Sequence, residues 1–114
     1  MTIPELLMVF VNWMVEESLK KMKVESGGWV NAGNLSLHVD VDRASRKEHL
    51  KLHSYGYCMA QAVFSTSDPQ TREAGLKFIV YKPVEASVTT RKHITQLEKT
   101  LLSTGTSYIV KAMP

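Results

Sequence analysis

A stretch of alternating residues at positions 35 to 58, LSLHVDVDRASRKEHLKLHSYGYC, constrains the fold more than any other feature of this sequence. Apolar side chains occupy every second position of residues 35–42, and the alternation returns over residues 48–54 after the polar link RASRK. Successive side chains of a β-strand point to opposite faces of its sheet. The pattern therefore predicts two strands, joined as an antiparallel hairpin, that share one apolar face and one polar face.

Further elements are predicted on both sides of this hairpin. Residues 57–65 (YCMAQAVFS) and 76–82 (LKFIVYK) read as two more strands, and Pro83 stops the second. Apolar residues at helical spacing predict a helix over residues 3–24 and another over residues 87–104.

Shorter signals refine the ends of these elements. Thr2 is suited to cap the first helix, Pro4 to its first turn, and Gly105 to the end of the last helix. Trp29 and Val30 are expected to start a short strand before the turn sequence NAGN. The tail TSYIVKAM is either a short final strand or a docked extension.

The order of these elements predicts the fold class. The chain has 114 residues, with 44% apolar and 22% charged residues, which suits one globular domain over residues 1–114. We expect an α+β two-layer sandwich, in which an antiparallel meander of about four to five strands carries the N- and C-terminal helices on one face. The other face of the sheet then stays polar and open.

The single cysteine, Cys58, excludes a disulfide within the chain and favours a reducing compartment. The apolar run at residues 6–15 is about half as long as the ~20 residues that a membrane span requires. Glutamates flank this run on both sides, where a signal peptide would carry a basic segment and a cleavage site. We therefore expect a cytoplasmic protein that does not enter a membrane.

The predicted first helix is apolar over more than one face. One stripe holds Met8, Val11, Val15, Leu19 and Met22, and a second holds Leu6, Phe10 and Trp13. We interpret this as a wide core face that packs on the sheet. The alternative is that Phe10 or Trp13 forms a homodimer or partner interface.

The polar face of the hairpin raises the question of a metal site. It combines His38, Asp40 and Asp42 on one predicted strand with His49, Lys51 and His53 on the next. Same-face neighbours on a strand lie roughly 7 Å apart, whereas zinc ligands converge to about 2.0–2.2 Å from the ion. We therefore interpret the face as solvated, with cross-strand ion pairs, or as a partner-binding face, and expect no cofactor. A metal-dependent enzyme that uses His38, Asp40 and His53 remains an alternative, which elemental analysis would test.

Other catalytic arrangements are not evident in the sequence. Cys58 lies in an alternating strand between Tyr57 and Met59, which favours a structural cysteine over a nucleophile. The chain has no GxSxG, phosphate-binding or dinucleotide-binding motif. Asp40 and Asp42 are equally open to solvent, so nothing separates their pKa values as acid–base catalysis requires. We predict that the protein is not an enzyme.

A nucleic-acid-binding function is the main alternative from composition. The net charge is +3, but the basic residues are scattered along the chain. Aromatic and basic side chains that could stack on and clamp a single strand are Tyr55, Tyr57, Tyr81, Arg43, Arg46 and Lys47. Asp40 and Asp42 at the centre of the same face would repel phosphate.

Several segments together resemble the TriTu family of immunity proteins of bacterial polymorphic toxin systems, including contact-dependent growth inhibition. They are, in order, FVNW in the first helix, Trp29, the strand NLSLHVDVD, the stretch HSYGYC and the closing helix TRKHITQLEKTLL. The resemblance spans roughly residues 6–102. His53 stands where the family pattern has tryptophan, which we interpret as a position adapted to a different partner.

The resemblance implies a binding protein that neutralises one cognate toxin in the cytoplasm of the producing cell, without chemistry of its own. The alternative function is a small regulatory nucleic-acid-binding module. The predicted toxin-binding residues lie on the hairpin and its outer face, and they are Asp40, Asp42, Arg43, Arg46, His53, Tyr55 and Tyr57.

Overall fold

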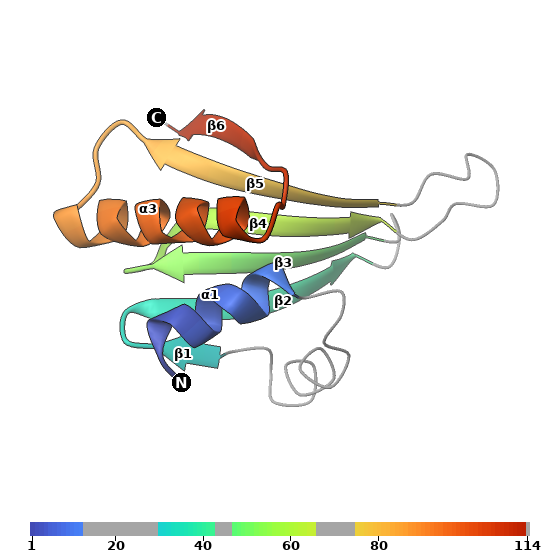
Figure 1. Cartoon of the computed structure of the whole chain (residues 1–114), viewed down its shortest axis with the longest axis horizontal. Coiled ribbons are helices and arrows are strands. Elements are labelled where there is room, and N and C mark those ends of the chain that lie inside the picture. The colour runs from blue at the N-terminus through green and yellow to red at the C-terminus, as the bar shows by residue number, and fades with distance from the viewer. Residues whose placement is uncertain (13–29, 43–46, 66–74, 114) are drawn as a thin grey trace.

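A computed structural model of the chain describes residues 1–12, 30–42, 47–65 and 75–113. The elements in chain order are α1 (Ile3–Val11), β1 (Val30–Ala32), β2 (Leu35–Asp42), β3 (Lys47–Ser54), β4 (Tyr57–Ser65), β5 (Gly75–Pro83), α3 (Val88–Ser103) and β6 (Ile109–Met113) (Figure 1). Within these residues the strands form one sheet in the order β1-β2-β3-β4-β5-β6, and both helices lie against the same face of it. The predicted α+β fold, with two layers, is therefore confirmed.

The described sheet has six strands rather than the four to five expected, and it is not wholly antiparallel. β6 runs parallel to β5, with Ile79 opposite Ile109 and Val80 opposite Val110. The connection from β5 to β6 passes through α3, which returns the chain to the end of the sheet where β5 began. A strand that follows such a crossover runs parallel to the one before it.

A capping box starts α1, as its sequence predicted. The Thr2 hydroxyl accepts a hydrogen bond from the Glu5 amide at 3.2 Å, and the Glu5 carboxylate accepts one from the Thr2 amide at 3.3 Å. The Thr2 hydroxyl also donates a hydrogen bond to the Glu5 carboxylate at 2.8 Å, and this bond, followed by the one from the Thr2 amide, lowers the pKa of Glu5 below its ordinary value. The helix ends at Val11, and Asn12 is its C-cap. The predicted unbroken helix over residues 3–24 is therefore wrong at Asn12, and residues 13–24 lie outside the described residues.

The buried side of α1 differs from one of the two predicted stripes. Leu6, Leu7, Phe10 and Val11 are buried, whereas Met8 is 38% exposed. The helix therefore turns the stripe of Leu6 and Phe10 toward the sheet and leaves Met8 on its outer side.

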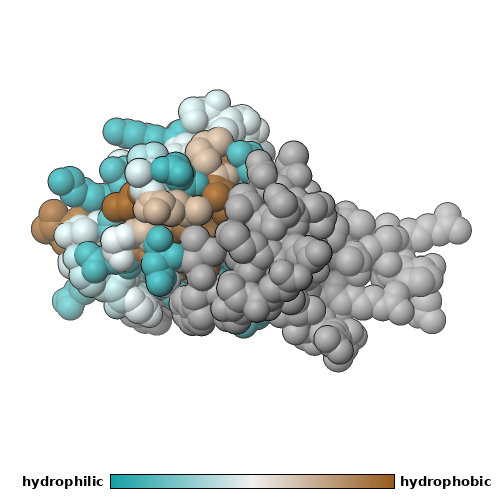
Figure 2. Space-filling model, turned by 90° about the horizontal axis from the view of Figure 1, so that it is seen from below, coloured by the Kyte–Doolittle hydropathy of each residue, from teal (hydrophilic) through white to brown (hydrophobic). Residues whose placement is uncertain are grey.

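Phe10 is not available to a partner. Its side chain has no exposed surface, and its ring meets Phe78 of β5 edge-on, with centroids 5.5 Å apart. The interpretation that this stripe packs on the sheet is therefore confirmed for Phe10. The alternative, a homodimer or partner interface through Phe10 or Trp13, gains no support from Phe10, and Trp13 lies outside the described residues. Exposed apolar side chains at this end of the molecule include Met1 and Met8. Figure 2, viewed from the β1 side, shows apolar residues in a band between polar ones.

α3 begins and ends as its sequence predicted. The hydroxyl of Ser87 accepts a hydrogen bond from the Thr90 amide at 3.1 Å, and Gly105 follows the helix with φ of +68°. Its buried side includes Ile94, Leu97 and Leu101. Val88 is apolar but 67% exposed, because it shares the outer side of the helix with the residues three, four and seven positions further on.

The β3–β4 hairpin contains two local features that position side chains. Its two-residue turn, Tyr55–Gly56, has positive φ at both positions (52° and 78°), as a type I′ turn requires. Beyond the turn the register shifts, since Leu52 lies opposite Ala60 while His53 lies opposite Cys58. Met59 is therefore an extra residue, a β-bulge, on β4.

The core lies between the helices and one face of the sheet. Its fully buried side chains come from α1, four strands and α3, and the largest are Leu6, Phe10, Leu35, Leu37, Leu50, Leu52, Met59, Val80, Leu97 and Leu101. Alternation on β2 and β3 thus places the predicted apolar face against the helices. No helix in the described ranges is long and apolar enough to cross a membrane.

Candidate functional site

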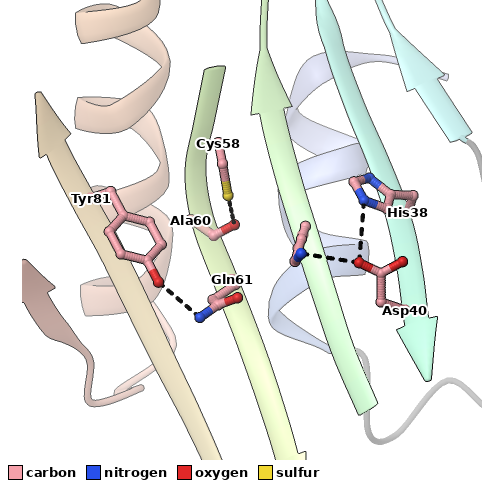
Figure 3. A network of polar contacts seen from close by, with 7 residues as sticks. His38, Asp40, Cys58, Ala60, Gln61 and Tyr81 are labelled. Atoms are coloured by element: carbon pink, nitrogen blue, oxygen red, sulfur yellow. Dashed lines mark hydrogen bonds and ion pairs between the residues drawn. The ribbon is translucent and has the colours of Figure 1, made fainter. Parts of the chain in front are cut away.

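The open face of the sheet is the side that the described helices do not cover. Every second residue of a strand points to this face, and the residues between them point to the core. The members with described side chains include His38, Asp40, His49, Lys51, His53, Cys58, Gln61, Val63, Lys77, Ile79, Tyr81, Ile109 and Lys111. Figure 3 shows several of them in front of the sheet, with the helices behind it.

An ion pair fixes the charges at the centre of this face. The Lys51 ammonium on β3 lies 3.0 Å from the Asp40 carboxylate on β2, and His38 Nε2 approaches the same carboxylate oxygen at 3.9 Å (Figure 3). The hydrogen bond from Lys51 lowers the pKa of Asp40 below its ordinary value. The Asp40 side chain is 55% exposed, so the pair adds at most about 1 kcal/mol to stability. The main effect of the pair is to hold the Asp40 carboxylate at a defined position on the open face.

Two histidines stack beside this ion pair. The rings of His38 on β2 and His53 on β3 lie 4.6 Å apart between centroids, with planes inclined by 16°. Burial lowers the pKa of both rings, Lys51 lowers it further in each, and Asp40 acts in the opposite direction. Both imidazoles are therefore mainly neutral at pH 7 and present a half-buried aromatic surface next to the charges.

A second polar contact lies across β4 and β5. The Gln61 amide donates a hydrogen bond to the Tyr81 hydroxyl at 2.8 Å, and the Cys58 thiol approaches the Ala60 carbonyl at 3.6 Å (Figure 3). Burial raises the pKa of the Cys58 thiol above its ordinary value. A thiol held in its protonated form is a poor nucleophile, which agrees with a structural role for Cys58.

The structure separates the residues that were predicted to form one binding site. Asp40 and His53 share the open face. Tyr55 lies at the tip of the β3–β4 turn, 58% exposed, and its hydroxyl accepts a hydrogen bond from the Asn34 side-chain amide at 2.7 Å. Asp42 ends β2, where its backbone pairs with Lys47. Arg43 and Arg46 lie outside the described residues.

Tyr57 is on the other side of the sheet. It lies opposite Ser54, whose side chain contacts α3, and its ring packs against the core. Burial raises the pKa of its phenol. The expected outward position of Tyr57 is therefore wrong, because the bulge at Met59 breaks the alternation between Tyr57 and the rest of β4.

The structure contains one buried polar network that the sequence analysis did not predict. Ser54 Oγ of β3 lies 2.9 Å from His93 Nδ1 and 3.2 Å from Thr90 Oγ1, both on α3. Ser54 is fully buried and His93 is 5% exposed, and burial lowers the pKa of His93. The signal was present, since Ser54 continues the inward spacing of Leu50 and Leu52. Because the pair is sealed from solvent, it links the two layers and does not form an accessible reaction centre.

The described side chains contain no group of three or more His, Cys, Asp or Glu residues that could hold a metal ion. On the open face, the histidines face each other as a stack and do not converge on a point. The face therefore presents charged side chains and aromatic rings in a fixed arrangement.

No family model, curated protein or solved structure matches the chain.

Proposed function

We propose that the chain is a binding protein without catalytic activity, whose open face contacts a protein partner. The resemblance to the TriTu immunity family suggests the partner: a toxin domain of a bacterial polymorphic toxin system, neutralised in the cytoplasm of the producing cell. The observation that carries the proposal is the Asp40–Lys51 ion pair beside the stacked His38 and His53 rings.

These side chains support a binding role because they are held in place before a partner arrives. Side chains that are already ordered lose less conformational entropy on association, so more of the contact energy appears as affinity. The adjacent opposite charges select a partner with complementary charges and reject others. The half-buried rings supply the kind of apolar surface that forms the centre of a protein interface.

Co-expression tests the proposal. The chain is produced together with the C-terminal region of the protein encoded immediately upstream, and growth and co-purification are measured. Relief of a growth arrest, with both chains in one complex, supports an immunity function. An arrest that the chain does not relieve contradicts it.

A charge-swapped variant tests whether the open face makes the contact. Asp40→Lys combined with Lys51→Asp keeps an ion pair on the face but exchanges the positions of its two charges. We expect loss of toxin binding with little change in the melting temperature. Lys99→Glu, on exposed α3, is the control variant and should bind as the wild type does.

Binding to single-stranded nucleic acid is a second candidate function, favoured by one observation. Among the charged side chains described on the open face, Lys51, Lys77 and Lys111 outnumber the single aspartate, Asp40. Such binding would weaken steeply as the salt concentration rises. A gel shift at low salt tests it, and the absence of any shift removes this candidate.

A further inference from the structure

β6 forms one edge of the described sheet. Within the described residues β5 is the only strand that pairs with it, and none of the backbone hydrogen bonds outside the strands involves it. In a parallel pair, alternate residues of a strand direct both of their backbone groups away from the neighbour. The outer side of β6 therefore presents amides and carbonyls in the geometry that receives another strand.

The side chains of β6 do not protect this edge. Ile109 on the open face and Val110 on the helix side are 47% and 48% exposed, so apolar surface lies on both sides of the strand. Natural sheets usually guard an edge with proline, a bulge or several charges. Residues 109–112 contain one charged residue, Lys111, and pair regularly with β5.

The charges beside the strand favour an acidic neighbour on the open face. Lys77 and Ile109 also line a hollow of about 200 Å³, which lies between β5 and the beginning of β6 and not on the outer edge. Lys77 and Lys111 both belong to the open face, so the two described charges nearest this edge on that face are positive. On the helix side, Glu98 is already engaged by the Lys82 ammonium at 3.1 Å and the Tyr108 hydroxyl at 2.7 Å.

We infer that the free edge of β6 binds an extended segment of a partner protein, which pairs with it as an additional strand. The segment that fits alternates two kinds of side chain. Acidic residues lie on the open-face side, next to Lys111, and apolar residues lie on the helix side, over Val110. Backbone pairing supplies affinity in this mode of recognition, and the alternate side chains supply specificity. This surface is distinct from the charged centre of the open face, and the inference does not depend on a toxin being the partner.

A second copy of the chain fits the edge less well. An antiparallel pair that uses all five residues of β6 places Lys111 directly opposite Lys111 of the other copy. Like charges directly opposite each other on neighbouring strands are destabilising.

A peptide titration tests the inference on the full chain. The probe is a short synthetic peptide of alternating valine and glutamate, added to the isotope-labelled protein, with amide chemical shifts and hydrogen exchange as readouts. We expect shifts concentrated at residues 109–113 and slower exchange of the outward amides of β6. The same peptide with alternate backbone nitrogens methylated keeps its side chains but cannot pair, and it should have no such effect.

A charge exchange tests the predicted specificity. Lys111→Glu should weaken binding of the glutamate peptide about two- to fivefold and strengthen binding of a matching valine–lysine peptide by a similar factor. Lys99→Glu, which changes the net charge equally on exposed α3, should leave both affinities unchanged.

Three results would overturn the inference. The first is a set of shifts that is absent or lies away from β6, and the second is equal binding by the methylated peptide. The third is self-association of the wild-type chain, seen by sedimentation and abolished by substitutions in β6, which would assign the edge to a second copy.

Discussion

At the scale of single residues, Ser54 and His93 carry the main polar contact that the structure describes between the two layers. A buried polar group is tolerated when it is hydrogen-bonded and is costly when its partner is removed. Ser54 meets two groups of α3 at once, His93 and Thr90, so its loss leaves both with fewer partners. This contact therefore joins α3 to β3 at a defined position, beside the apolar contacts of the helix.

Removal of the Ser54 hydroxyl should destabilise the protein. Ser54→Ala leaves His93 Nδ1 buried without this partner, and we expect a loss of about 1–3 kcal/mol in the free energy of unfolding. Chemical denaturation measures it. Ser103→Ala, at an exposed position on α3, is the matched control, with an expected change within about 0.5 kcal/mol. Equal stability of the two variants would show that the buried network contributes nothing.

Histidine burial predicts a pH dependence of stability. Burial lowers the pKa of His38, His53 and His93 below the ordinary value of 6.5. Below pH 6.5 the unfolded chain therefore binds more protons than the folded chain, so folding becomes less favourable as the pH falls. We expect the melting temperature to be highest above pH 6.5, to decrease below it, and to decrease less in His93→Gln. A melting temperature that stays constant or rises from pH 7.5 to 5.5 would contradict this.

At the scale of elements, alternation in the sequence located the strands well. The predicted ranges 35–42, 48–54, 57–65 and 76–82 agree with β2 to β5 within a residue at each end. The capping signal at Thr2 likewise marked the start of α1, and Gly105 marked the end of α3. Each of these features depends on neighbours in the sequence, which is why a sequence pattern reveals it.

The features that sequence patterns missed depend on pairing between distant segments. Met59 adds one residue to β4 only with respect to β3, and this bulge places Tyr57 on the helix side. β6 runs parallel to β5 because α3 brings the chain back to the end of the sheet where β5 begins. The residues TSYIVKAM contain no local pattern from which this strand direction could be predicted. Of the predicted binding residues, Asp40 and His53 do share one face, because simple alternation on adjacent strands places them there.

The β3–β4 turn yields a prediction about backbone conformation. An added Cβ on Gly56 meets no atom within 4 Å, but its φ of +78° is unfavourable for any residue with a side chain. Gly56→Ala should therefore cost about 1–2 kcal/mol through the backbone alone. Gly56→Asn should cost less, since asparagine tolerates this conformation better. Thermal unfolding measures both, and an alanine variant as stable as the wild type would show that the turn does not require glycine.

At the scale of the whole molecule, the proposed function assigns stability to the core side of the sheet and binding to the open face. The helices and the inner face of the sheet contain the core, while the open face holds charges and rings that contribute little to stability. The Asp40→Lys/Lys51→Asp variant should therefore keep the wild-type melting temperature within about 2 °C while it loses affinity for its partner. Equal loss of folding and binding would show that this division is wrong.

The most direct test of a binding function at the open face is co-expression with the C-terminal region of the protein encoded immediately upstream, which is the proposed toxin region. The wild type is compared with the charge-swapped variant. We predict that the wild type restores growth and co-purifies with the toxin region. The folded charge-swapped variant should do neither, while Lys99→Glu behaves as the wild type. If the charge-swapped variant protects and co-purifies as well as the wild type, the open face is not the binding surface. If the wild type itself fails to relieve an arrest, the proposed immunity function is wrong.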